Sequence, residues 1–174
     1  MHMETQRLLI RPFQPEDGHA LHAIFGDAET MEQCEPAYTL EKTQQFLKAF
    51  CIDRRGALAA TLRDSGILIG YILFKEMEAG VYEIGWIFRR DYWRQGYAFE
   101  ACSAVVRCAF EQRHAHKLMA EAIDGVKSVG LMEKLGMHRE GVQRSHTRDN
   151  LGCWRDLYLY GMLREDWNAA RQTK

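Results

Sequence analysis

One segment near the middle of the chain runs from a predicted strand through a tight turn into a predicted helix: Glu83-Ile84-Gly85-Trp86-Ile87-Phe88-Arg89-Arg90-Asp91-Tyr92-Trp93-Arg94-Gln95-Gly96-Tyr97-Ala98. The strand, Val81–Phe88, is rich in β-branched and aromatic residues. The helix, from Gly96 to about Gln112, carries apolar residues at i, i+3 and i+4 spacing. Because Gly96 and Ala98 have little or no side chain, main-chain N–H groups of the turn and of the helix N-terminus can converge on an anion such as a pyrophosphate.

Hydrophobic periodicity predicts further strands and helices on both sides of this segment. The predicted strands are Leu8–Arg11, Ala57–Leu62, Ile67–Phe74, Lys117–Ile123, Met137–Thr147 and Trp154–Leu163. The predicted helices begin at Pro15, at Leu40 (to about Phe50) and at about Ser128 (to Leu135). The order β-α-α-β-β-β-α-β-α-β-β predicts an α/β fold, in which a mixed sheet has helices on its faces.

Length and composition exclude several classes of function. The chain has 174 residues, which predicts a single domain over residues 4–170. Its 23 basic and 24 acidic residues leave a net charge of -1, so nucleic acid is not an expected partner. The longest apolar stretch, Ile67–Phe74, is far shorter than a membrane span. Five cysteines without metal-ligand spacing favour free thiols in a reducing cytoplasm and no metal site.

The pyrophosphate-binding turn differs from two well-known nucleotide motifs. The chain has no GxxxxGK[ST] sequence, and no GxGxxG sequence follows its first strand. A diphosphate held by main-chain groups alone, without a magnesium-binding Ser or Thr, indicates a nucleotide that serves as a handle. Coenzyme A is such a ligand.

Trp93-Arg94-Gln95-Gly96-Tyr97-Ala98 resembles the acyl-CoA pyrophosphate loop, Q/R-x-x-G-x-G/A, of the GNAT N-acetyltransferases. Four further segments resemble the ribosomal-protein N-acetyltransferase-like (RimJ/RimL-type) branch in the same order: Thr5–Pro12, Glu83–Trp86, Leu131–Met137 and Trp154–Tyr160. The resemblance covers nearly the whole chain and implies the GNAT fold with acetyl-CoA as co-substrate.

The resemblance also implies how acetyl-CoA binds. In the family, the strand before the loop and the strand after the long helix splay apart, and the pantetheine arm pairs with the exposed main chain like an extra strand. In this chain, those main-chain groups would belong to Trp86, Ile87 and Phe88, and one N–H group could polarise the thioester carbonyl. The cofactor-binding residues implied in the loop are Arg94, Gln95, Gly96, Tyr97, Ala98 and Phe99, with Arg89 and Arg90 adding positive charge.

Glu83 is the leading candidate for the base that deprotonates the amine, and strand alternation places it on one face with Gly85 and Ile87. The alternative is a glutamate that only bonds to a neighbouring strand or loop. Ser128 would contact the thiol or pantetheine, or would begin its helix as an N-cap. His146 is a second candidate base, against the alternative of a surface histidine.

The chain departs from the family pattern at two positions. Met132 stands where many GNAT enzymes have a tyrosine general acid, and the branch's asparagine position falls on Gly125 or Asp124.

Three other features have a structural and a functional interpretation. Cys102 is a core residue or a nucleophile, Asp156 has a structural or groove role, and the acidic run Asp27, Glu29, Glu32 and Glu35 is solvated or attracts a cationic amine.

We therefore expect a cytoplasmic N-acetyltransferase that moves acetyl from acetyl-CoA to a primary amine by direct attack. The acceptor stays open among a ribosomal-protein N-terminus, another peptide, a polyamine, an amino acid and an antibiotic. The alternative is a non-catalytic acyl-CoA-binding or regulatory module. The exposed late strands could support a homodimer.

Overall fold

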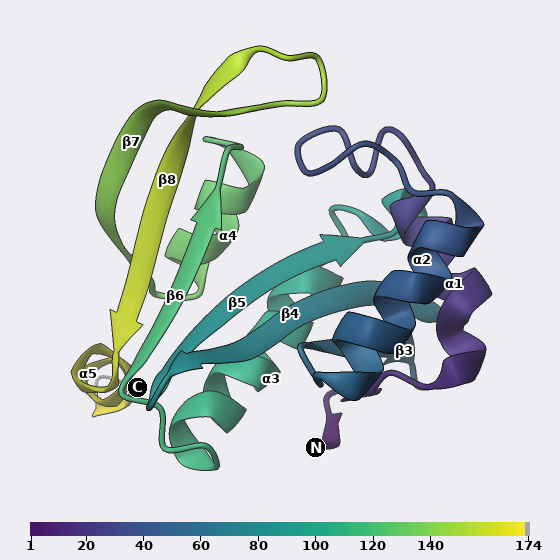
Figure 1. Cartoon of the computed structure of the whole chain (residues 1–174). Coiled ribbons are helices and arrows are strands. Elements are labelled where there is room, and N and C mark those ends of the chain that lie inside the picture. Colours follow the sequence, from purple (N-terminus) through teal and green to yellow (C-terminus); the bar gives the residue numbers. More distant parts are fainter. Residues whose placement is uncertain (173–174) are drawn as a thin grey trace.

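A single eight-stranded sheet organises the chain in the computed structural model, which describes residues 1–172 (Figure 1). The strand order is β1-β2-β3-β4-β5-β6-β8-β7. The strands are β1 (Met3–Glu4), β2 (Leu8–Pro12), β3 (Ala57–Leu62), β4 (Leu68–Glu78), β5 (Val81–Phe88), β6 (Lys117–Ala122), β7 (His138–Arg148) and β8 (Trp154–Leu163). Neighbouring strands are antiparallel, except that β5 and β6 are parallel.

Helices cover both faces of this sheet. They are α1 (Gly18–Phe25), α2 (Leu40–Phe46, continued by a π-helical segment Leu47–Asp53), α3 (Tyr97–Glu111), α4 (Lys127–Lys134) and α5 (Arg164–Gln172). One buried cluster joins α3 and Met132 of α4 to one face of the sheet, and a second cluster joins α1 and α2 to the other face. The sheet thus lies between two helical layers, and each layer has its own core.

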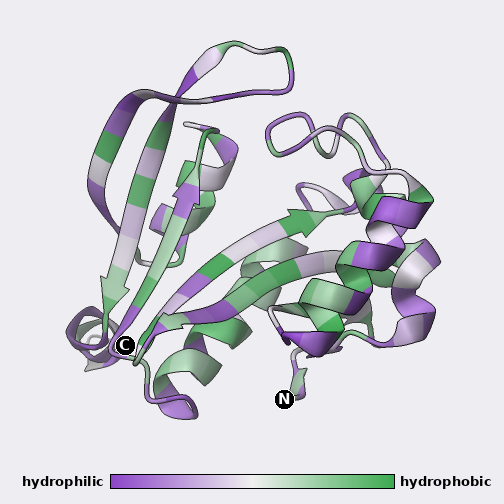
Figure 2. Cartoon of the chain, in the orientation of Figure 1, coloured by the Kyte–Doolittle hydropathy of each residue, from purple (hydrophilic) through white to green (hydrophobic). Residues whose placement is uncertain are grey.

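The predicted order of elements is confirmed, with additions at both ends of the chain. β1 is too short to show a periodicity, since it contains two residues. α5 is hydrophilic along most of its length, so its sequence does not show the apolar stripe of a packed helix (Figure 2). It packs instead through one aromatic residue, because Trp167 stacks on Phe110 of α3 with ring centroids 5.5 Å apart.

The parallel pair β5 and β6 separates soon after it begins, as Figure 1 shows. Within the described residues, the two strands pair from Val81 opposite Lys117 to Glu83 opposite Met119 and no further. β6 pairs with β8 along its whole length, from Lys117 to Ala122, and β5 continues to pair with β4 up to Phe88. The predicted splayed strand pair is therefore present, and Glu83 lies at its fork.

β7 forms one edge of the sheet, and most of its residues are exposed and hydrophilic (Figure 2). A homodimer that uses these late strands stays a prediction. No helix among the described residues reaches the length and hydropathy that a bilayer crossing requires.

Candidate active site

The fork leaves one edge of β5 free of a neighbouring strand. The Arg89 N–H donates to the Ile69 carbonyl at 2.9 Å, which continues the register that sets Phe88 opposite Gly70. Since the direction of main-chain polar groups alternates along a strand, Ile87 also directs its groups toward β4, whereas Trp86 and Phe88 direct theirs into the gap. Of the three residues expected to offer main-chain groups there, Ile87 is therefore the exception.

The turn between β5 and α3 is folded by its own side chains. Trp93 Nε1 donates to the Phe88 carbonyl at 2.7 Å, and Gln95 Nε2 donates to the Asp91 carbonyl at 2.9 Å. Gly96 has φ +83°, a left-handed conformation that favours glycine, and it immediately precedes the first residue of α3. The first main-chain bond of the helix runs from Glu100 N–H to the Gly96 carbonyl at 3.0 Å. The N–H groups of Tyr97, Ala98 and Phe99 precede that bond and are left to bind an anion.

The three arginines around this turn differ in their partners. Arg89 pairs with Asp91 at 3.0 Å, and Arg90 pairs with Glu29 and, at 3.6 Å, with Asp27. Arg94 is exposed and makes no ion pair within residues 1–172. The charge of Arg94 is therefore available to a phosphate, whereas that of Arg90 is directed to the acidic loop.

Glu83 occupies the last paired position of the fork, on the face of the sheet that α1 and α2 cover. Ile84 packs in the α3 cluster, whereas Ile87 packs against the α1–α2 cluster. Since Glu83 alternates with Ile84 and shares a face with Ile87, it lies on the face that α1 and α2 cover. Its side chain is 17% exposed, and its Oε2 lies 2.9 Å from Nζ of Lys75, the residue directly opposite on β4. The carboxylate thus has a cross-strand partner and also lies where the strands part.

A pocket of about 210 Å³ lies between the loop after α1, the end of β6 and the β7–β8 hairpin. Carboxylates outnumber cations in its lining, which includes Glu32, Asp124, Asp149 and Arg155. At the hairpin tip, Asn150 Nδ2 donates to the carbonyls of Met31 at 2.8 Å and Glu35 at 3.0 Å, so one side chain connects two walls of the pocket.

Comparison with known proteins identifies the family to which this fold belongs. Residues 7–138 match the family described as acetyltransferase (GNAT) domain. The chain belongs to the GNAT acetyltransferase family. The uncharacterized N-acetyltransferase YnaD of Bacillus subtilis is 35% identical over 97% of this chain and all of its own length. The [Ribosomal protein uS5]-alanine N-acetyltransferase of Escherichia coli is 28% identical, over 62% of this chain and 57% of its own.

Solved structures agree with this assignment. A GNAT-family acetyltransferase from Bacillus anthracis superposes with a TM-score of 0.86 at 31% identity, covering 95% of this chain and 99% of that one. The ribosomal-protein-S5-alanine acetyltransferase from Vibrio fischeri has a TM-score of 0.80 at 19% identity, covering 96% and 98%, which shows a shared fold. GNAT membership makes the chain an N-acetyltransferase and implies acetyl-CoA as its co-substrate.

The asparagine position of the branch falls on Gly125 or Asp124, and at Gly125 the Tyr158 side chain occupies the space beside the main chain. A β-carbon on Gly125 would lie 2.9 Å from the hydroxyl oxygen of Tyr158. Asp124 Oδ1 accepts hydrogen bonds from the N–H groups of Val126 at 2.8 Å and Lys127 at 2.9 Å, so this carboxylate binds main-chain groups where the chain enters α4. Ser128 is the second residue of α4 and is half-buried; the N-cap is Val126, so the alternative in which Ser128 is the N-cap is wrong. Contact of Ser128 with the thiol stays a prediction.

Met132 and Cys102 are both fully buried in the α3 cluster of this GNAT fold. The thioether of Met132 cannot donate a proton to a leaving thiolate, so the usual tyrosine has no substitute at this position. Burial raises the pKa of the Cys102 thiol far above its usual value. A thiol without access to solvent and held in its neutral form is not a nucleophile, which leaves Cys102 a core residue.

His146 lies on an exposed part of β7, where the register with β8 shifts between Gln143 and Thr147. In this irregular segment, Ser145 has φ +47°, and its N–H donates to Asp156 Oδ1 at 2.8 Å. Of the two roles expected for Asp156, structural or in the groove, this bond supports the structural one. The exposure of His146 favours the surface interpretation over that of a base.

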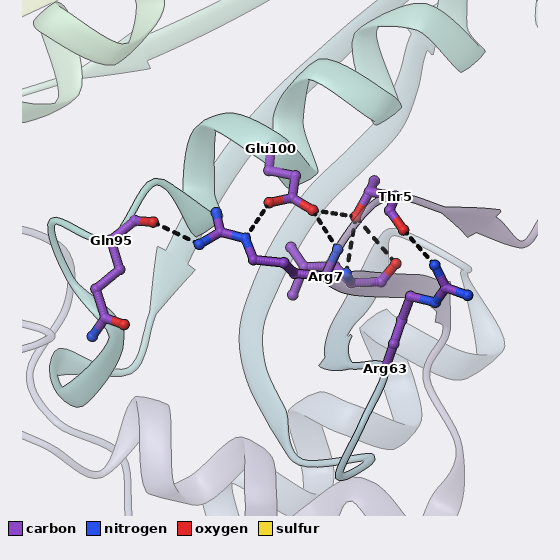
Figure 3. A network of polar contacts seen from close by, with 6 residues as sticks. Thr5, Arg7, Arg63, Gln95 and Glu100 are labelled. Carbon is purple, nitrogen blue, oxygen red and sulfur yellow. Dashed lines mark hydrogen bonds and ion pairs between the residues drawn. The ribbon is translucent and has the colours of Figure 1, made fainter.

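One network near the turn was not predicted from the sequence (Figure 3). Arg7, next to β2, donates from Nε to Glu100 Oε2 of α3 at 2.7 Å and from Nη1 to the Gln95 carbonyl at 3.0 Å. Burial opposes ionisation of Glu100, but hydrogen bonds from Thr5 and Arg7 outweigh it and hold its pKa below the usual value. Thr5 and Arg7 belong to a segment that marked the family by resemblance, and only the fold brings them to residues more than 80 positions away.

Proposed function

We propose that this GNAT acetyltransferase transfers acetyl from acetyl-CoA to a primary amine by direct attack, with Glu83 as the proton acceptor. The observation that carries the proposal is the fork of β5 and β6, which ends its pairing at Glu83. The fork gives the pantetheine arm a free strand edge, and it brings a carboxylate to the same point of the sheet.

The main chain of this protein holds and orients the thioester. The N–H groups of Tyr97, Ala98 and Phe99 bind the pyrophosphate, and the exposed Arg94 adds a positive charge beside them. Trp86 offers its N–H and carbonyl to the pantetheine arm, and an N–H at this edge can polarise the thioester carbonyl as charge develops on its oxygen. Acetyl-CoA supplies the activated acyl group and a thiolate leaving group.

A protein or peptide N-terminus is the acceptor that these features support best. An α-amino group has a pKa of about 7.7–8.0, against about 10.4 for a lysine side chain, so a modest base is sufficient to deprotonate it. Glu83, which is 17% exposed, can accept this proton directly or through one water molecule. Excess carboxylates around the pocket, Glu32 and Asp124 among them, favour the approach of a cationic group. One GNAT relative is named as an alanine N-acetyltransferase of ribosomal protein uS5.

A non-catalytic acyl-CoA-binding module is the second candidate, and one observation favours it. Met132, at the position of the usual tyrosine acid, is fully buried. A thiolate leaves as a fairly stable anion, so the missing acid would slow direct transfer without preventing it.

An acceptor screen distinguishes the two functions. The protein would be incubated with acetyl-CoA and a panel of ribosomal-protein N-terminal peptides, lysine-containing peptides with blocked N-termini, polyamines and amino acids, and thiol release and product mass would be measured. We expect acetylation of free N-terminal peptides and little acetylation of the blocked ones. Binding of acetyl-CoA without turnover on any acceptor would support the module.

All five cysteines are free and two are exposed, which supports a reducing compartment such as the cytoplasm.

A further inference from the structure

Arg7 connects the beginning of the chain to the turn that precedes α3 (Figure 3). Besides its bonds to Glu100 and to the Gln95 carbonyl, its guanidinium lies 4.1 Å from the centroid of the Tyr97 ring. A β-carbon on Gly96 would lie 3.4 Å from Nη2 of the same guanidinium. One side chain therefore contacts the residues on both sides of Gly96, and it lies next to the position that a side chain at Gly96 would occupy.

The position of Arg7 is itself fixed from two sides. Its main-chain N–H donates to Glu100 Oε1 at 2.8 Å, and Thr5 Oγ1 donates to the same oxygen at 2.6 Å. The carboxylate of Glu100 thus holds both the main chain and the side chain of Arg7. The guanidinium cannot follow a movement of the turn unless these bonds break.

The bond from Arg7 to the Gln95 carbonyl determines the direction of the next N–H group. In a trans peptide, the C=O and N–H groups of one peptide unit point in opposite directions. Because Arg7 holds the Gln95 carbonyl on its own side, the Gly96 N–H is directed away from Arg7. Among the described residues this N–H has no hydrogen-bond acceptor. It is available to an anion together with those of Tyr97, Ala98 and Phe99.

Charge gives Arg7 a second effect on the turn. Glu100 lies in the first turn of α3, and its side chain is 18% exposed. An unpaired carboxylate at this point would repel a pyrophosphate. The ion pair with Arg7, at 2.7 Å, compensates that charge.

We propose that Arg7 is a positioning residue for acyl-CoA binding, which holds the Gln95–Gly96 peptide so that the Gly96 N–H joins the pyrophosphate-binding groups. Arg7 acts through the turn and does not contact the reacting atoms. The proposal rests on acetyl-CoA as the ligand of this turn, and it does not depend on which amine accepts the acetyl group.

The test compares Arg7→Ala and Arg7→Lys with Arg63→Ala. Arg63 is a matched control, because it also contacts the N-terminal segment, through the Thr5 carbonyl at 2.9 Å and Glu4 at 3.4 Å, but does not contact the turn. The Kd of CoA would be measured by calorimetry, and the phosphorus NMR signals of the bound pyrophosphate would be recorded at saturating CoA. Thermal unfolding of each variant reports on the fold itself.

Loss of a hydrogen bond to a charged group predicts a Kd about tenfold higher, or more, for Arg7→Ala. Arg7→Lys keeps the charge but cannot bond to Glu100 and Gln95 together, so its Kd should lie in between. The pyrophosphate signals should shift in both Arg7 variants. Arg63→Ala should bind CoA as the unmodified protein does, and every variant should stay folded at the temperature of the binding measurement.

Three results would overturn the proposal: a Kd for Arg7→Ala within twofold of the unmodified value, an equal rise for Arg63→Ala, or unchanged pyrophosphate signals in the Arg7 variants. If the unmodified protein did not bind CoA, the ligand of the turn would be misassigned and the proposal would fail with it. If it bound CoA but acetylated no amine, only the proposed function would fail. Should Arg7→Ala not fold, Arg7→Lys provides the same comparison.

Discussion

The proposed acyl-CoA side and the proposed acceptor side of this protein are built differently. The acyl-CoA side consists of β5, the turn of residues 89–96 and α3, and its helix contributes eight buried residues to the protein interior. The acceptor side consists of the loop of residues 26–39 and the β7–β8 hairpin, whose residues are mostly exposed. The hairpin tip contacts that loop through two hydrogen bonds from Asn150. The first side is fixed by burial. In the second, β8 is anchored by its pairing with β6 and by the buried Tyr160 and Met162, whereas the exposed hairpin tip is joined to the loop by few polar contacts and can change without loss of the fold.

Glu83 lies at the last paired position of the β5–β6 fork, and its substitution should have the largest effect on turnover. Glu83→Gln keeps the shape of the side chain but cannot accept a proton, so we expect kcat to fall roughly 100-fold while the Kd of CoA is unchanged. Lys75→Met is the control, because it removes the 2.9 Å ion pair and leaves the carboxylate. If both variants lose activity equally and in proportion to their stability, Glu83 is a structural partner of Lys75.

Gly96→Val should break the acyl-CoA side while the rest of the fold remains. A residue with a β-carbon at φ +83° costs about 1–2 kcal/mol, and the turn would relax toward another conformation. We expect the Kd of CoA to rise by about tenfold or more. Gly66→Val is the matched control, because Gly66 also has a positive φ, +71°, but lies in the exposed β3–β4 turn. Among the described residues, no atom lies within 4 Å of a β-carbon placed there. An equal loss of CoA affinity in both variants would show that general destabilisation is the cause.

Asn150→Ala should affect the acceptor side alone. The substitution removes the bonds of 2.8 Å and 3.0 Å that join the hairpin to the loop, so the pocket walls lose their connection. We expect the KM of the acceptor to rise by roughly fivefold, the range of one or two ordinary hydrogen bonds, with the Kd of CoA unchanged. Gln143→Ala, on the exposed edge strand β7, serves as the control. A change in CoA binding would contradict the separation of the two sides.

The smallest effect concerns acid stability. The pKa of Glu100 is lowered in the folded protein, so its contribution to the free energy of unfolding is present at neutral pH and is lost as the pH falls through its folded pKa. Glu100→Gln should therefore show a flatter decline in stability between about pH 6 and pH 3, by about 1 kcal/mol. Denaturant unfolding at several pH values measures this. Parallel curves for the two proteins would exclude Glu100 as a source of acid sensitivity.

The sequence predicted the acyl-CoA side better than the acceptor side, for a physical reason. Val81–Phe88, the turn at Gly96 and the apolar stripe of α3 are local patterns, and each determines its own conformation. Local patterns also located Glu83, whose position on its strand follows from alternation. They did not reveal that Ile87 directs its main chain toward β4, because this depends on the register with another strand.

The features that the sequence did not predict are contacts between residues far apart in the chain. Arg7 and Glu100 are 93 positions apart, and Asn150 is more than 100 positions from Met31 and Glu35. No periodicity connects such residues, and each contact is made by single polar side chains. The sequence indicates His146 as a candidate base because it belongs to the late strand pair, but it does not reveal the register shift between Gln143 and Thr147, within which Ser145 bonds to Asp156.

The separation of 93 residues between Arg7 and Glu100 also has a kinetic consequence. Closing so long a loop is slower than forming a helix or a hairpin, because the chain must lose more entropy before the contact forms. During refolding, α3 can therefore reach its helical form before the two ends of this loop meet. The ability to bind CoA should accordingly return after the helical signal in circular dichroism, as a late step of folding.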